Sequence, residues 1–215
     1  MTVPLSSTSE CKLSNIEKVD IILPRFYHIR MSNTGTKTRD MAFIALGAVV
    51  IIVCSWISIP TVVPFTLQTF AVFFLLSLLG GKRATFSILI YILLGAVGVP
   101  VFSGFKGGFG VLAGPTGGYV FGFILMGILY MLCEKLFGRR MKKLPVSLLT
   151  MLIGLVICYV FGTAWFILVY AGPSGGVGIG AALAMCVFPF IIPDLVKMAL
   201  AVVLSSRIEK QFPRG

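Results

Sequence analysis

Six long apolar segments, separated by short polar or glycine-rich loops, dominate the sequence after residue 40. They cover approximately 41–58, 66–79, 84–98, 119–137, 146–170 and 181–206. A helix needs about 20 residues to cross the ~30 Å hydrocarbon core of a bilayer. The second and third segments are shorter, so they would extend into neighbouring loops or stand where the bilayer thins. The pattern predicts an all-α integral membrane protein with six transmembrane helices, multi-pass in the cell membrane.

The composition supports this class and argues against a nucleic-acid-binding domain. Hydrophobic residues make up 58% of the chain and charged residues only 12%, whereas a soluble domain carries about 25% charged residues. The net charge of +11 arises largely from basic residues clustered in short loops, which is how membrane topology is set. We therefore expect contact with membrane lipid and none with nucleic acid.

The loop charges also predict an orientation. Lysine and arginine residues precede the first segment, join the second to the third and the fourth to the fifth, and follow the sixth, whereas the opposite loops carry Lys106 alone. Both termini are then cytoplasmic. Residues 1–36 are expected to be a cytoplasmic tail, either disordered or partly an artefact if translation begins at Met31. Residues 37–210 would form the membrane domain and 211–215 a C-terminal tail.

The sixth segment contains the most informative polar residues. In "PFIIPDLVK" (189–197), Asp194 and Lys197 follow Pro189 and Pro193. Because proline interrupts helical hydrogen bonding, we expect a short helix at 179–188 and a spanning helix from about 191 to 208, with Asp194 near the membrane mouth. At spacing i, i+3 the two charges share one helical face. They are either a structural ion pair or, as a cavity beside the proline break favours, polar contacts for a small ligand.

Glycine-rich loops lie on the predicted outer side. Residues 99–118 read "VPVFSGFKGGFGVLAGPTGG", and residues 171–180 read "AGPSGGVGIG". A loop of about 20 residues without secondary structure is usually functional, and glycine lets the backbone approach a ligand closely. The glycines of the first loop that we take as candidates for ligand contact are Gly107, Gly117 and Gly118.

Several other polar or aromatic residues on that side have two readings. Lys106 is either solvated or meets an anionic group. Thr66, Gln68 and Thr69 either cap the second helix or contact a ligand. Tyr119 and Trp165 are either interfacial belt residues or pocket aromatics, and the glycines beside Tyr119 favour the pocket for it.

Sequence motifs for catalysis are missing. The stretch "LLSLLGGKRA" has Leu76 and Arg83 where a phosphate-binding loop requires Gly and Ser/Thr. The five cysteines form no CxxC pattern and His28 is the single histidine, so neither a metal site, a disulfide framework nor a catalytic triad is expected. We predict a binding subunit without cofactors that is not an enzyme and takes its energy from partner proteins.

Three stretches resemble one known family. "GPTGGYVFGF" (114–123), "FGTAWF" (161–166) and "PFIIPDLVK" (189–197) are similar to BioY, the biotin-binding substrate-specificity (S) subunit of energy-coupling factor (ECF) transporters, over about 37–210. The resemblance implies a six-helix fold with the vitamin site near the outer face. It also implies a transmembrane coupling protein and two ATPase subunits as partners. Asp194 and Lys197 would then contact biotin, since its ureido ring offers N–H donors and a carbonyl acceptor.

Two features depart from that family's pattern. The sequence "GFKGG" places Phe105 and Lys106 where relatives often carry a neutral polar residue, and the small-residue motif of the first helix is imperfect at Met41 and Ala45. The alternatives are an S subunit for another small vitamin and a structural membrane protein whose charge pair only pins helices. If biotin is the ligand, Asp194→Ala or Lys197→Ala should weaken its binding by about 2 kcal/mol or more.

Overall fold

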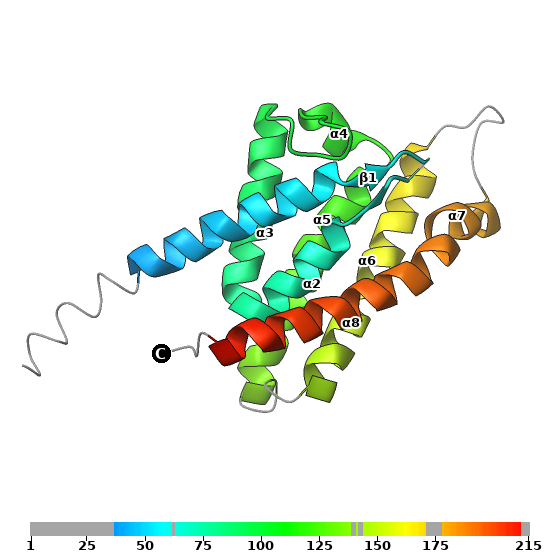
Figure 1. Ribbon diagram of the computed structural model, residues 1–215. Coiled ribbons are helices and arrows are strands. Elements are labelled where there is room, and N and C mark those ends of the chain that lie inside the picture. Colours follow the sequence, from blue (N-terminus) through cyan, green and yellow to red (C-terminus); the bar gives the residue numbers. More distant parts are fainter. Residues whose placement is uncertain (1–36, 62, 139–140, 142–143, 171–177, 212–215) are drawn as a thin grey trace, which may run out of the picture. The chain divides into compact units, whose positions relative to one another are not determined.

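The computed structural model describes residues 37–61, 63–138, 141, 144–170 and 178–211 (Figure 1). The chain divides into two compact units, Met1–Ala42 and Phe43–Gly215, and the second is described below. The predicted N-terminal tail at 1–36 and residues 212–215 of the predicted C-terminal tail lie outside the described residues. The same is true of residues 171–177 in the second glycine-rich loop.

Helices account for nearly all of the regular structure, as the apolar segments predict. The helix Lys37–Trp56 is followed by α2 (Gln68–Leu79), α3 (Gly81–Val97), α5 (Gly117–Phe137), α6 (Leu144–Val169) and α8 (Phe188–Gln211). Two short helices, α4 (Phe109–Ala113) and α7 (Ile179–Cys186), lie in the connections. The strands β1 (Ser58–Ile59) and β2 (Phe65–Thr66) form a two-residue antiparallel hairpin before α2.

Within the part of the chain that the structure describes, four helical stretches are long and apolar enough to cross a membrane. They are Lys37–Trp56, Gly117–Phe137, Leu144–Val169 and the stretch Ile179–Ile208 that contains α7 and most of α8. The helices α2 and α3 are shorter, with 12 and 17 residues. Large apolar side chains such as Leu93, Val160 and Leu200 are exposed along these helices, which is expected where lipid rather than water surrounds the protein.

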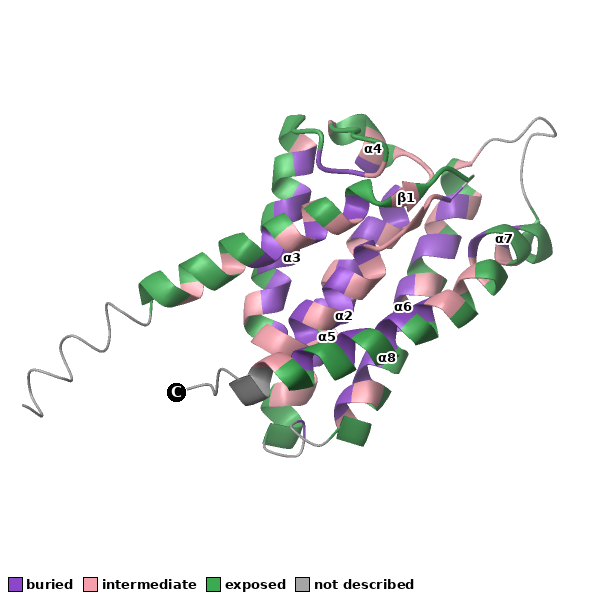
Figure 2. Ribbon diagram, viewed as in Figure 1, coloured by how far each residue is buried: buried purple, intermediate pink, exposed green. Residues whose placement is uncertain are grey.

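Buried residues lie on the faces where the helices of the second unit meet (Figure 2). Within this unit α5 packs along α6 and α3, and α2 packs along α8. Glycines allow the closest approaches, because a Cβ atom at Gly122 would lie 2.6 Å from the sulfur of Cys158, and one at Gly154 would lie 2.7 Å from Met126. Small residues at such contacts are typical of helix packing in membranes.

The break in the last apolar segment is present but is displaced from the prolines. The helix α7 ends at Cys186, and α8 begins at Phe188, so the interruption falls at Val187. Pro189 lies in the first turn of α8, where the missing N–H costs nothing, and Pro193 is inside the helix. The expectation that a proline break directly precedes Asp194 is therefore wrong. Asp194 lies within the continuous helix α8.

The expectation of an unstructured loop at 99–118 is also wrong. The N–H of Phe102 donates to the carbonyl of Lys106 at 2.9 Å, α4 follows, and α5 already begins at Gly117. Val101, Phe102 and Leu112 are 2–3% exposed and join the hydrophobic core. Apolar side chains spaced among the glycines thus anchor this segment.

The turn between Phe102 and Lys106 uses the left-handed backbone region. Gly104 has a φ of 71°, and Phe105 has a φ of 57°, which is uncommon for a residue with a side chain. The Phe105 ring lies 5.1 Å from the ring of Trp56, whose Nε1 donates to the carbonyl of Pro100 at 2.9 Å. Phe105 of "GFKGG", where the sequence departs from the family pattern, thus packs against Trp56 at the end of the helix Lys37–Trp56.

Candidate ligand-binding cavity

A cavity of about 430 Å³ lies within the second unit, between the β1–β2 loop, the segment 102–116 and the helices α2, α3, α5, α6 and α8. Its walls include apolar side chains such as Val120, Phe123 and Leu155. Sites for small ligands are typically apolar cavities of about 300–1,000 Å³ with a few placed polar groups. The polar side chains that line this one are Thr61, Thr66, Gln68, Thr69, Tyr91, Ser103, Lys106, Thr116, Tyr119, Tyr159, Asp194 and Lys197.

Asp194 and Lys197 form the ion pair that their spacing predicts. They lie one turn apart on α8, and the ammonium is 2.9 Å from Oδ1 of the carboxylate. Their side chains are only 2% and 8% exposed. Two charges removed from water in this way are stable only when further hydrogen bonds complete their coordination.

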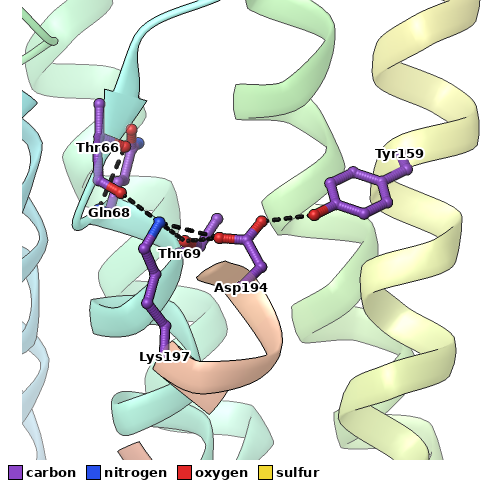
Figure 3. Close-up of polar contacts among 6 residues, drawn as sticks. All are labelled: Thr66, Gln68, Thr69, Tyr159, Asp194 and Lys197. Atoms are coloured by element: carbon purple, nitrogen blue, oxygen red, sulfur yellow. Dashed lines mark hydrogen bonds and ion pairs between the residues drawn. The ribbon is translucent and has the colours of Figure 1, made fainter. Parts of the chain in front are cut away.

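Those further hydrogen bonds come from β2, α2 and α6 (Figure 3). The hydroxyl of Thr69 donates to Asp194 Oδ1 at 2.9 Å, and the hydroxyl of Tyr159 donates to Asp194 Oδ2 at 2.6 Å. The ammonium of Lys197 donates to the carbonyl of Thr66 at 2.7 Å and to the hydroxyl of Thr69 at 3.2 Å. It also lies 4.1 Å from the centre of the Phe65 ring, where a cation is attracted to the π face.

The start of α2 explains why these partners are available. Thr66 ends β2, so its carbonyl lies outside the helix and is free to accept from Lys197. Leu67 is the N-cap of α2, and no side chain caps that end, although the hydroxyl of Thr66 accepts from the N–H of Gln68 at 3.3 Å. The side chain of Gln68 instead donates to the hydroxyl of Tyr91 on α3 at 2.9 Å.

Two more residues proposed from the sequence line the cavity. The hydroxyl of Tyr119 on α5 lies 3.0 Å from that of Thr163 on α6, and either can be the donor. Lys106 is exposed at the turn that follows Phe105. Asp194, Lys197, Gln68, Tyr119 and Lys106 are therefore brought together around one space.

Four other proposed ligand-contact residues are not among those that line the cavity. A Cβ atom at Gly107 would lie 2.4 Å from the carbonyl oxygen of Val99, and one at Gly117 would lie 1.7 Å from that of Leu112. A Cβ atom at Gly118 would lie 2.3 Å from the Cβ of Trp165. The three glycines are therefore needed for close packing of this segment.

Trp165 belongs to the same packing arrangement. Its Nε1 donates to the carbonyl of Gly114 at 3.0 Å, and its ring lies 6.0 Å from that of Phe121. This position joins α6 to the end of the glycine-rich segment, and the residue is half-buried rather than directed into the cavity.

Sequence reasoning missed Tyr159, Tyr91 and Phe65. Tyr159 stands in an apolar stretch of α6 where a hydroxyl needs a partner, and that requirement was the one available signal. The contacts of Tyr91 and Phe65 depend on how α3 and the β1–β2 hairpin pack against α2 and α8. Among the described residues no group of three His, Cys, Asp or Glu side chains comes together, so no metal centre is assigned.

The apolar helices and the largely apolar cavity with a buried ion pair at its wall define a multi-pass membrane protein of the small-ligand-binding class. The BioY family model matches residues 29–214, and the chain belongs to this family.

Known proteins agree with that assignment. The chain is 38% identical over 174 residues to a probable biotin transporter BioY of Pyrococcus horikoshii, covering 80% of this chain and 98% of that protein. It is 39% identical over 173 residues to the biotin transporter BioY of Thermotoga maritima, with 80% and 96% covered. A crystal structure of the S-component for biotin from an ECF-type ABC transporter matches with a TM-score of 0.72 and 26% identity, over 84% of this chain and 94% of that one.

Proposed function

We propose that this protein is the high-affinity biotin-binding S subunit of an ECF transporter. It takes biotin into the cavity and delivers it across the membrane together with a transmembrane coupling protein and two ATPase subunits. The observation that carries the proposal is the Asp194–Lys197 pair, buried at the wall of a cavity of suitable size. The biotin-transporting relatives support the choice of ligand.

The cavity offers partners for each chemical part of biotin. The ureido ring has two N–H donors, which suit the carboxylate of Asp194. The thiophane ring and the aliphatic chain suit the apolar walls, which include Val120, Phe123 and Leu155. The carboxylate tail suits the exposed ammonium of Lys106 at the segment 102–106.

We propose six membrane crossings with both termini in the cytoplasm, α2 and α3 being the two short spans. A variant whose five native cysteines are replaced by serine can be given a single cysteine as Lys82→Cys, in the basic α2–α3 connection, or as Lys106→Cys. A membrane-impermeant thiol reagent should label the Lys106→Cys variant in intact cells and the Lys82→Cys variant only after permeabilisation. Labelling of both from one side would refute the topology.

The function is tested by isothermal titration of the detergent-solubilised chain with biotin, beside a panel of other small vitamins. Biotin should bind saturably and raise the melting temperature, since a ligand that binds only the folded state stabilises it. Binding of a different vitamin in place of biotin would identify an S subunit of other specificity. Binding of none would favour the structural role for the ion pair.

A further inference from the structure

We propose that the cavity also accepts amides of biotin, in which an amine is joined to the carboxyl group at the end of the aliphatic chain. This inference rests on the proposed function and extends it from one vitamin to a class of conjugates. Its basis is the position of the cavity's opening and the chemistry of the residues around that opening.

The exposure of the cavity walls places the opening. Among the described residues that line the cavity, Thr61, Lys106 and Gly110 are exposed, and the others are half-buried or buried. Thr61 lies in the β1–β2 loop, and the other two lie in the segment 102–116. Asp194 and Lys197, by contrast, are buried in α8. The cavity therefore opens between these two loops, and the ion pair lies in its buried part.

The ion pair determines which end of biotin faces the opening. A ligand carboxylate in the buried part of the cavity would lie near the carboxylate of Asp194, which already pairs with Lys197 at 2.9 Å. A further negative charge there would be removed from water and placed beside a like charge, which is unfavourable. The uncharged ring system suits the buried part, so the carboxyl group is left toward the opening.

The cation at the opening is a weak partner for that carboxyl group. The cations among the residues that line the cavity are Lys197 and Lys106, and Lys106 is exposed. Because exposed ion pairs contribute little, the charge of the biotin carboxylate adds little to the affinity. Replacing the carboxylate by a neutral amide should therefore raise Kd by no more than about fivefold.

Space for the amine part of a conjugate exists at Gly110. This residue belongs to α4 and lines the cavity, and a Cβ atom built there would meet no heavy atom of the described residues within 4 Å. Gly107 and Gly117 in the same segment are packed against backbone instead. A substituent on the carboxyl end can thus leave the cavity beside Gly110 without displacing the described part of the chain.

The proposal is tested by calorimetric titration of the detergent-solubilised wild type with biotin and with two of its amides. The amide with methylamine removes the charge, and the amide with the side chain of lysine adds bulk as well. We expect the Kd of each amide to lie within tenfold of the Kd of biotin. A larger penalty for either amide would overturn the inference and leave the proposed function standing, whereas absence of biotin binding would refute the proposed function itself.

Two tryptophan substitutions on α4 test where the conjugate leaves the cavity. Gly110→Trp narrows the opening, and its matched control Ala113→Trp places the same side chain at an exposed residue of the same helix that does not line the cavity. We expect the ratio of the Kd for the lysine amide to the Kd for biotin to rise at least tenfold in Gly110→Trp and to stay within twofold of wild type in Ala113→Trp. Thr61→Trp narrows the opening from the other loop and replaces Gly110→Trp if melting curves show that the latter does not fold. Equal ratios in the narrowed variant and the control would overturn the assigned opening.

Discussion

Polar contacts at the cavity end of the helices differ in organisation from those at their opposite end. At the cavity, Asp194, Lys197, Thr69 and Tyr159 form one connected network beside an open space. At the other end, hydrogen bonds that link pairs of helices include Ser77 with Ser205 at 2.5 Å, Tyr130 with Ser147 at 2.8 Å and Gly81 N–H with Glu134 Oε2 at 2.7 Å. None of these residues lines the cavity.

The comparison teaches that burial alone does not identify a binding residue in a membrane protein. Polar groups at both ends are enclosed because unsatisfied ones are costly in lipid. What separates the two sets is whether the polar groups line the cavity. Changes at the cavity end should alter ligand affinity and stability together, whereas changes at the opposite end should alter stability alone.

The largest effect is expected for Asp194→Asn. It leaves the ammonium of Lys197 buried without its counter-charge, which costs about 3–5 kcal/mol of folding stability when a buried pair is broken. Biotin affinity should fall by about 2 kcal/mol or more, because a charge-assisted hydrogen bond is lost. Melting curves and calorimetric titration measure the two quantities. Wild-type affinity in this variant would place the ligand elsewhere.

A matched pair of glycine substitutions sharpens the contrast. A Cβ at Gly162 would lie 2.3–2.6 Å from ring atoms of Tyr119, which lines the cavity, and a Cβ at Gly127 would lie 2.6 Å from the hydroxyl of Thr85, which does not. Both Gly→Ala changes should cost about 1–3 kcal/mol of stability through overpacking. Only Gly162→Ala should also weaken biotin binding, since it displaces the Tyr119 ring. Equal binding losses in the two variants would remove the distinction.

Glu134→Ala tests the opposite end directly. The carboxylate accepts from the first N–H of α3, where an acidic group satisfies a free donor and interacts favourably with the helix dipole. Its removal should lower the free energy of unfolding by about 0.5–2 kcal/mol and leave the biotin Kd unchanged. A shifted Kd with unaltered stability would mean that this end participates in ligand binding.

The smallest effect belongs to Lys106→Gln. Lys106 is exposed, and exposed ion pairs contribute about 0.2–1 kcal/mol. Biotin affinity should fall by that amount, and the difference from wild type should shrink as salt is added, because ions screen an exposed charge. Titrations at low and high salt measure it. A salt-independent loss would indicate that Lys106 is enclosed when biotin binds.

The extent to which the sequence predicted this molecule follows from the range of the interactions involved. The length of the apolar runs predicted the helices, and the i, i+3 spacing predicted the Asp194–Lys197 pair. Both features depend on residues that are near one another in the chain. The sequence predicted the helix break after residue 188, but the structure has it at Val187. The reason is that Pro189 fits the first turn of α8 and does not end a helix there.

Long-range contacts were where prediction failed. Nothing near Tyr159 in the chain indicates that its hydroxyl meets Asp194, which is 35 residues away. Gly117 and Gly118 were predicted as ligand contacts because glycine permits close approach, and the structure shows that a Cβ at these positions would meet Leu112 and Trp165. The sequence shows that space is needed at a glycine and does not show what fills it.

The most direct test of the account is a calorimetric titration of biotin into three purified proteins, the wild type, Asp194→Asn and Glu134→Ala. We predict saturable binding to the wild type, nearly identical binding to Glu134→Ala despite its lower melting temperature, and at least about 30-fold weaker binding to Asp194→Asn, which corresponds to about 2 kcal/mol. Biotin binding of equal strength to the wild type and Asp194→Asn would contradict the claim that the cavity beside α8 is the ligand site.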